Sequence, residues 1–137
     1  MNVKQIIIIR KDLKMRRGKE NSQAAHASIA WLTKRINLPG TLIVPTNTDG
    51  AIYNNIWFSA AESEWMAGSF AKITLQVNSE QELYDIYKRA KAAGLETHII
   101  IDSGKTEFDG IPTPTTVGIG PDEDYKFIGI TDNLKLY

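Results

Sequence analysis

A run of four isoleucines, Ile6 to Ile9, lies near the start of the chain and restricts how the chain can fold. Within the predicted strand, Val3 to Ile9, these isoleucines form a continuous β-branched run rather than an alternating one, which is typical of a strand buried on both faces. Such a strand needs a central or parallel position in a sheet. The run is far shorter than the roughly 20 apolar residues of a membrane span.

Hydrophobic spacing and capping residues predict the elements around this strand. The pattern indicates helices from about residue 19 to 35, from Ser59 to Gly68, and from Ser79 to Gly94, and strands at 71–77, 96–101 and 115–119. The tail, Ile128 to Tyr137, carries the apolar residues Leu134, Leu136 and Tyr137, which suggests that it docks. We expect an α/β fold: one domain, residues 1–137, with a four-stranded mixed β-sheet and helices on both faces.

The segment between residues 37 and 57 allows two interpretations. Leu42–Val44 and Ile52–Tyr53 are separated by a turn sequence at Thr48–Gly50, which is typical of a β-hairpin. The prolines and glycines of the same segment also suit an irregular excursion from the body. The sequence leaves both interpretations open.

Charge is distributed unevenly along the chain. The 137 residues carry 16 basic and 16 acidic side chains, yet residues 1–35 hold nine Lys/Arg and only two Asp/Glu. A basic face is enough to bind a polyanion, although a basic solvated loop would have the same composition. Cysteine is absent, so disulfides, thiol catalysis and cysteine metal sites are excluded. We expect a cytoplasmic protein, because no signal sequence is present.

Lys19, Gln23 and His26 are spaced by four and three residues, so they form one stripe on the predicted helix. A lysine at a helix N-terminus adds positive charge where the helix dipole is already positive. This arrangement favours an anionic or carbonyl-oxygen ligand. A solvated Lys19 and a half-buried, structural His26 are the alternative.

Asp102 ends an apolar strand, and ligands of open α/β sheets collect at the carboxyl ends of strands. The following Gly104-Lys105-Thr106 is similar to the end of a nucleotide phosphate loop. That motif requires a glycine where this chain has Ile99, so we exclude it. No histidine and carboxylate spacing typical of a metal site is present.

These stretches together resemble the second, archaeal/eukaryotic-type class of peptidyl-tRNA hydrolases. The N-terminal part of the resemblance is RKDLKMRRGK followed by NSQAAHAS, and the C-terminal part is AGLETHIIIDSGKTEF, PTPTTVGIGP and the closing NLKLY. Order, spacing and chemistry agree over two distant blocks, residues 1–35 and 70–137. Relative to the family pattern, Ala24 replaces a cysteine and Ser22 replaces an alanine, and we interpret residues 37–57 as an insertion.

The resemblance implies hydrolysis of the ester between a peptide and the terminal ribose of tRNA by an α/β homodimer. It implies no metal and no organic cofactor. It places catalytic groups at Lys19, Asp102, Thr106 and Thr115, with Gln23 and His26 beside them. The predicted tRNA-binding residues are Lys11, Lys14, Arg16, Arg17 and Lys105.

Two points, the general base and the function, stay open at the level of the sequence. Asp102 and His26 are both candidates for the general base, because a histidine ordinarily titrates near 6.5. The threonines would supply hydroxyl donors that position the ester. A non-catalytic RNA- or partner-binding module, and a hydrolase of another small ester or amide, are the alternative functions.

Overall fold

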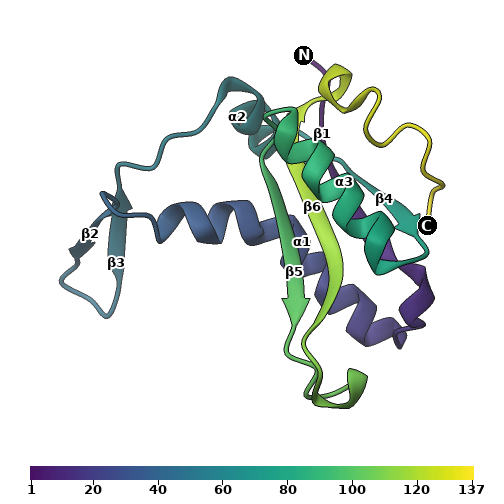
Figure 1. Cartoon of the computed structure of the whole chain (residues 1–137). Coiled ribbons are helices and arrows are strands. Elements are labelled where there is room, and N and C mark those ends of the chain that lie inside the picture. The colour runs from purple at the N-terminus through teal and green to yellow at the C-terminus, as the bar shows by residue number, and fades with distance from the viewer.

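The structure is a computed structural model that describes all 137 residues (Figure 1). The helices are α1 (Arg17–Ile36), α2 (Ala60–Ala67) and α3 (Glu80–Ala92). The strands are β1 (Val3–Arg10), β2 (Leu42–Pro45), β3 (Ala51–Asn54), β4 (Lys72–Val77), β5 (Thr97–Asp102) and β6 (Thr113–Glu123). The main sheet has the order β4-β1-β6-β5. Strand β1 is parallel to β4 and antiparallel to β6, which confirms the mixed four-stranded sheet.

Strand β1 is central and divides the core into two layers. Ile6 and Ile8 belong to the cluster under α3, whereas Ile7 and Ile9 pack with Ala27 of α1. Figure 1 shows α1 and α3 on opposite faces of the sheet. The prediction of a strand buried on both faces and of helices on both faces is therefore confirmed.

Helix α1 approaches the sheet closely at Gly118 of β6. A Cβ atom at Gly118 would lie only 2.1 Å from the backbone oxygen of Ala27. The buried Gln5 holds the same interface, because its Nε2 donates to Ser28 O at 2.8 Å and its Oε1 accepts from Ser28 Oγ at 2.6 Å. The small residues of α1 thus permit a contact between backbones.

Replacing Gly118 with alanine is expected to lower the free energy of unfolding by about 2 kcal/mol, because α1 has to move away from β6. Urea unfolding would measure this loss. Gly18→Ala, in helix α1, is the control, since a Cβ atom at Gly18 would contact nothing within 4 Å. Equal stability of the two variants would contradict the close approach.

Some element bounds differ from the predicted ones. Helix α1 begins at Arg17 rather than at Lys19, because Lys14 adopts a left-handed conformation and redirects the chain after a short 3-10 turn at Lys11–Leu13. Strand β6 extends well beyond residues 115–119 at both ends. The segment around residue 48 forms the β2–β3 hairpin, so the irregular alternative is wrong.

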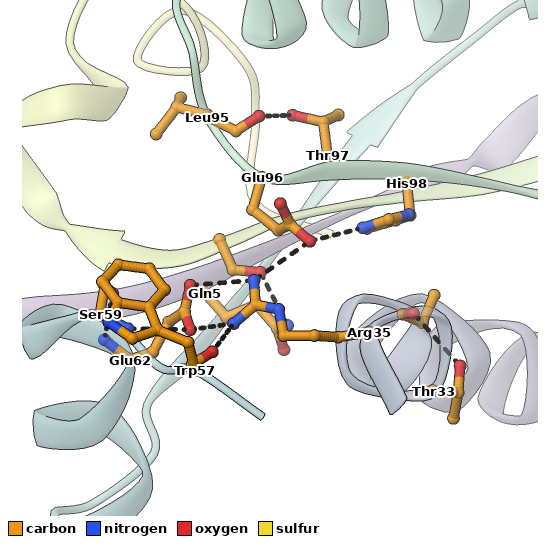
Figure 2. A network of polar contacts seen from close by, with 12 residues as sticks. Gln5, Thr33, Arg35, Trp57, Ser59, Glu62, Leu95, Glu96, Thr97 and His98 are labelled. Atoms are coloured by element: carbon orange, nitrogen blue, oxygen red, sulfur yellow. Dashed lines mark hydrogen bonds and ion pairs between the residues drawn. The ribbon is translucent and has the colours of Figure 1, made fainter. Parts of the chain in front are cut away.

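The C-terminal end of α1 is held by an ion-pair network around Arg35 (Figure 2). The guanidinium pairs with both carboxylate oxygens of Glu62 and lies 3.4 Å from Glu96. Glu96 in turn contacts the Nε2 atom of His98 at 3.0 Å. These contacts join α1, α2 and the start of β5, and the hydrogen bond from His98 is the main cause of the lowered pKa of Glu96.

The C-terminal tail docks on β4, as predicted. Leu136 forms an antiparallel bridge with Leu75, and Tyr137 N–H donates to Thr74 O at 3.0 Å. None of the helices combines the length and the apolar character that crossing a bilayer requires.

Candidate active site

Lys19, Asp102 and Thr106 meet at the C-terminal end of β5, beside the first turn of α1. The Nζ atom of Lys19 lies 2.8 Å from Asp102 Oδ1 and donates to Thr106 Oγ1 at 2.9 Å. The Lys19 and Asp102 side chains are only 15% and 12% exposed, so water screens their attraction weakly. The fold thus joins residues that lie more than eighty positions apart.

The Asp102 carboxylate has three donors within the chain. Besides Lys19, Gln23 Nε2 donates to Oδ1 at 3.4 Å and Gly104 N–H donates to Oδ2 at 2.9 Å. The hydrogen bond from Lys19 is the main cause of the lowered pKa of Asp102, burial opposes it, and the Gly104 N–H reinforces it. Asp102 is therefore ionised at neutral pH and is a weak base.

Gln23 is buried and is held in place by two threonines. Thr115 Oγ1 donates to Gln23 Oε1, and Thr116 Oγ1 donates to the backbone oxygen of Gln23 at 3.2 Å. Consecutive residues of β6 can both contact α1 because the β5–β6 register shifts at Ile100 and Ile101. Thr115 is fully buried, so it positions Gln23 and does not reach a substrate ester directly, contrary to the expectation from sequence.

His26 lies one turn further along α1 from Gln23. Its side chain is exposed and makes no hydrogen bond within the chain. Its charge acts at Asp102, where it contributes to the lowered pKa of that carboxyl. The imidazole nitrogens therefore stay open to a ligand or to solvent.

The N-terminus of α1 presents unused donors to the same region. Arg16, the N-cap residue, supplies no side-chain cap, and the first helical bond is donated by Glu20 N–H. The N–H groups of Arg17, Gly18 and Lys19 consequently donate to nothing in the chain. The five predicted tRNA-binding residues, Lys11, Lys14, Arg16, Arg17 and Lys105, are all exposed, and none takes part in an ion pair.

Sequence reasoning missed two neighbours of this centre, Gly104 and Phe108, and a contact between Tyr137 and Glu20 on α1. Gly104 has a φ of +81°, and a Cβ there would lie 2.3 Å from Ile111 O, so only glycine can present its N–H to Asp102 in this turn. The Phe108 ring lies 6.0 Å from Lys19 Nζ. The Tyr137 hydroxyl donates to Glu20, which raises the pKa of Tyr137 to about 12. Of these residues, only Gly104 could have been recognised from the sequence, because Asp-Ser-Gly is a turn sequence.

No group of three or more His, Asp or Glu side chains is arranged to hold a metal ion. His98, which shares a strand with Asp102, is paired with Glu96 instead.

Comparison with known proteins agrees with this geometry. Residues 3–137 match the model of a family described as peptidyl-tRNA hydrolase PTH2. The chain belongs to the PTH2 family. The match spans both blocks of the sequence resemblance and the segment between them.

Archaeal relatives named peptidyl-tRNA hydrolase are similar over nearly their whole length. The protein of Methanothermobacter thermautotrophicus is 36% identical over 134 residues, which cover 98% of this chain and 99% of that protein. The Nanoarchaeum equitans protein is 37% identical over 135 residues, with the same coverage. The Saccharolobus solfataricus protein is 33% identical over 134 residues, 98% of each chain.

A solved structure shares the fold at low sequence identity. A protein of unknown function from Agrobacterium, Atu0240, superposes with a TM-score of 0.57 at 13% identity and covers 100% of this chain and 98% of its own. This similarity concerns the fold alone.

Proposed function

We propose that the Lys19–Asp102 centre hydrolyses the ester bond between the peptide and the tRNA in peptidyl-tRNA, which releases the tRNA for reuse. Membership of the PTH2 family supports this reaction and does not favour a non-catalytic binding module. The observation that supports the assignment to these residues is the shielded contact of 2.8 Å between Lys19 Nζ and Asp102 Oδ1. The contact lies beside unused helix N–H groups and free basic side chains.

Each group has a distinct role in the proposed reaction. His26 accepts a proton from a water molecule, whose oxygen attacks the ester carbonyl carbon. One N–H of the Lys19 ammonium is not used by Asp102 or Thr106, and with the α1 N–H groups it stabilises the negative charge on the carbonyl oxygen. The bond to the ribose oxygen then breaks, and that oxygen takes up the proton. Asp102 orients Lys19 and the water, because its lowered pKa makes it a weak base.

The five free basic residues are proposed to bind the phosphates of the tRNA acceptor stem. Phosphate contacts carry no sequence information, so tRNAs of different sequence should bind alike. Raising the salt concentration from 50 to 200 mM is expected to raise KM on the order of tenfold to a hundredfold through counterion release. Arg16→Gln and Arg17→Gln together should make this salt dependence less steep. A KM that does not respond to salt would contradict this role.

The proposed function is tested with the purified chain and N-acetyl-aminoacyl-tRNA. We expect release of the N-acetyl amino acid, and we expect uncharged tRNA to inhibit competitively. A binding module would retain tRNA without hydrolysing the ester. A hydrolase of small esters would cleave a simple amino-acid ester and would ignore uncharged tRNA.

We also propose a cytoplasmic homodimer, as the sequence resemblance implies. The β2–β3 hairpin stands apart from the sheet (Figure 1) and exposes Leu42, Ile43 and Ile52 by about half of their surfaces, which supports a self-association surface. Sedimentation of the purified chain would test the dimer. The interpretation of residues 37–57 as an insertion stays a prediction.

A further inference from the structure

The two edges of the main sheet differ in whether another part of the chain pairs with them. At the β4 edge, the C-terminal tail adds a short antiparallel segment, in which Gln76 N–H donates to Lys135 O and Tyr137 N–H donates to Thr74 O. At the opposite edge, β5 pairs only with β6. Figure 1 shows no strand or tail beside β5. One edge is covered by the chain itself and the other is open.

The open backbone groups of β5 can be identified from its pairing. Glu96 O accepts from Gly120 N–H and Ile100 O accepts from Thr115 Oγ1, so the backbone groups of the even-numbered residues point toward β6. Successive residues of a strand direct their backbone groups to opposite sides. Those of Ile99 and Ile101 therefore point away from the sheet, and no other part of the chain bonds to them.

This edge also lacks the protection that exposed strands usually have. Natural edge strands carry charged residues, prolines or bulges that prevent pairing with another chain. Ile99, Ile100 and Ile101 are neither charged nor proline, and the side chain of Ile101 is 53% exposed. The register shift beside them places its extra residue, Thr115, in β6 and not in β5. An unprotected edge is a template on which an extended peptide can add as a further strand.

The open edge leads directly into the proposed catalytic centre. Asp102, which contacts Lys19, is the last residue of β5. The unpaired part of the strand starts after the buried Thr97. From Ile99 to Asp102 the strand advances roughly 10 Å, the length of about three residues of an extended peptide. A strand that lies along this edge and ends at Asp102 therefore places its terminal carbonyl at Lys19.

We propose that the open edge of β5 binds the peptide part of the substrate as an added, parallel strand. The inference rests on the proposed function, because the esterified carboxyl end of the peptide must lie at Asp102. The amino end then points back toward Thr97, which is the direction of a parallel strand. Main-chain hydrogen bonds do not depend on side chains, so one site accepts peptides of any sequence whose amides carry N–H groups.

Modified substrates test this pairing on the unaltered protein. We expect N-acetyl-tetrapeptidyl-tRNA to show a kcat/KM about fivefold higher than N-acetyl-aminoacyl-tRNA, the effect of about one net hydrogen bond. N-methylation of single amides should abolish this gain at alternate positions only, because a strand bonds to its neighbour through every second residue. As a control, exchanging side chains at the same positions should change kcat/KM less than twofold.

Ile101→Pro tests the same edge from the protein side. Proline removes the backbone N–H of residue 101, which points away from β6, so the hydrogen bonds between β5 and β6 are kept. Ile101→Ala is the control that keeps this N–H. Ile101→Pro should lose the higher kcat/KM of the tetrapeptidyl substrate relative to N-acetyl-aminoacyl-tRNA, and Ile101→Ala should keep this ratio. If the proline variant does not fold, the N-methyl series decides alone.

Three results would overturn the inference. One is equal kcat/KM for the long and short substrates in the unaltered protein, and another is an N-methyl series without alternation. The third is a change from dimer to monomer in Ile101→Pro with the length preference intact, which would assign the edge to a second copy of the chain. By contrast, an unaltered protein that hydrolyses neither substrate would refute the proposed function itself.

Discussion

Lys19→Met is expected to lower kcat for peptidyl-tRNA hydrolysis by about 100- to 1000-fold, the usual effect of removing one donor to an oxyanion. The methionine keeps the length of the side chain but removes the ammonium that contacts Asp102 and Thr106. Single-turnover release of an N-acetyl amino acid from tRNA measures this step directly. Thermal unfolding checks that the variant is folded.

Lys105→Met is the matched control for charge. Lys105 lies in the loop that follows Asp102, is exposed and has no ion-pair partner, so its loss should raise KM and leave kcat unchanged. A Lys19→Met variant whose kcat stays within fivefold of the unaltered protein would remove Lys19 from the reaction. Equal losses of kcat in both variants would show that charge near the site, rather than contact with the reacting atoms, determines the rate.

His26→Ala is expected to lower kcat/KM at pH 7.5 by about 100-fold or more, the usual contribution of a general base. An imidazole base works only when it is neutral. The rate of the unaltered protein should therefore fall toward acidic pH. His26→Ala should lose this pH dependence together with most of its activity.

Asp102→Asn separates the two candidates for the base. It should lower the rate at every pH and keep the fall toward acidic pH, because Asp102 only orients Lys19 and the water. If Asp102 were the base, the rate of the unaltered protein would be flat between pH 5 and 8. The reason is that the lowered pKa of Asp102 places its titration below the ordinary value of 3.8.

Much of the fold follows from local patterns in the sequence. The isoleucine run predicted a central strand, and β1 is buried on both faces between β4 and β6. The helix predicted from Ser59 is α2, and Ser59 and Glu62 form both bonds of a capping box at its start. Helix and strand bounds do not follow from apolar spacing alone: Lys14 adopts a left-handed conformation, and α1 starts at Arg17, earlier than its apolar pattern indicates.

The sequence by itself determined which residues can do chemistry: a lysine, a glutamine and a histidine on one helical stripe, and an aspartate at a strand end. Helical spacing and strand ends are local properties, so they can be recognised without a fold. Only the tertiary structure decided that the carboxylate has three donors and that Thr115 faces Gln23 instead of a substrate. Strand order and the register shift at Ile100 depend on contacts between distant segments, and no local pattern specifies them.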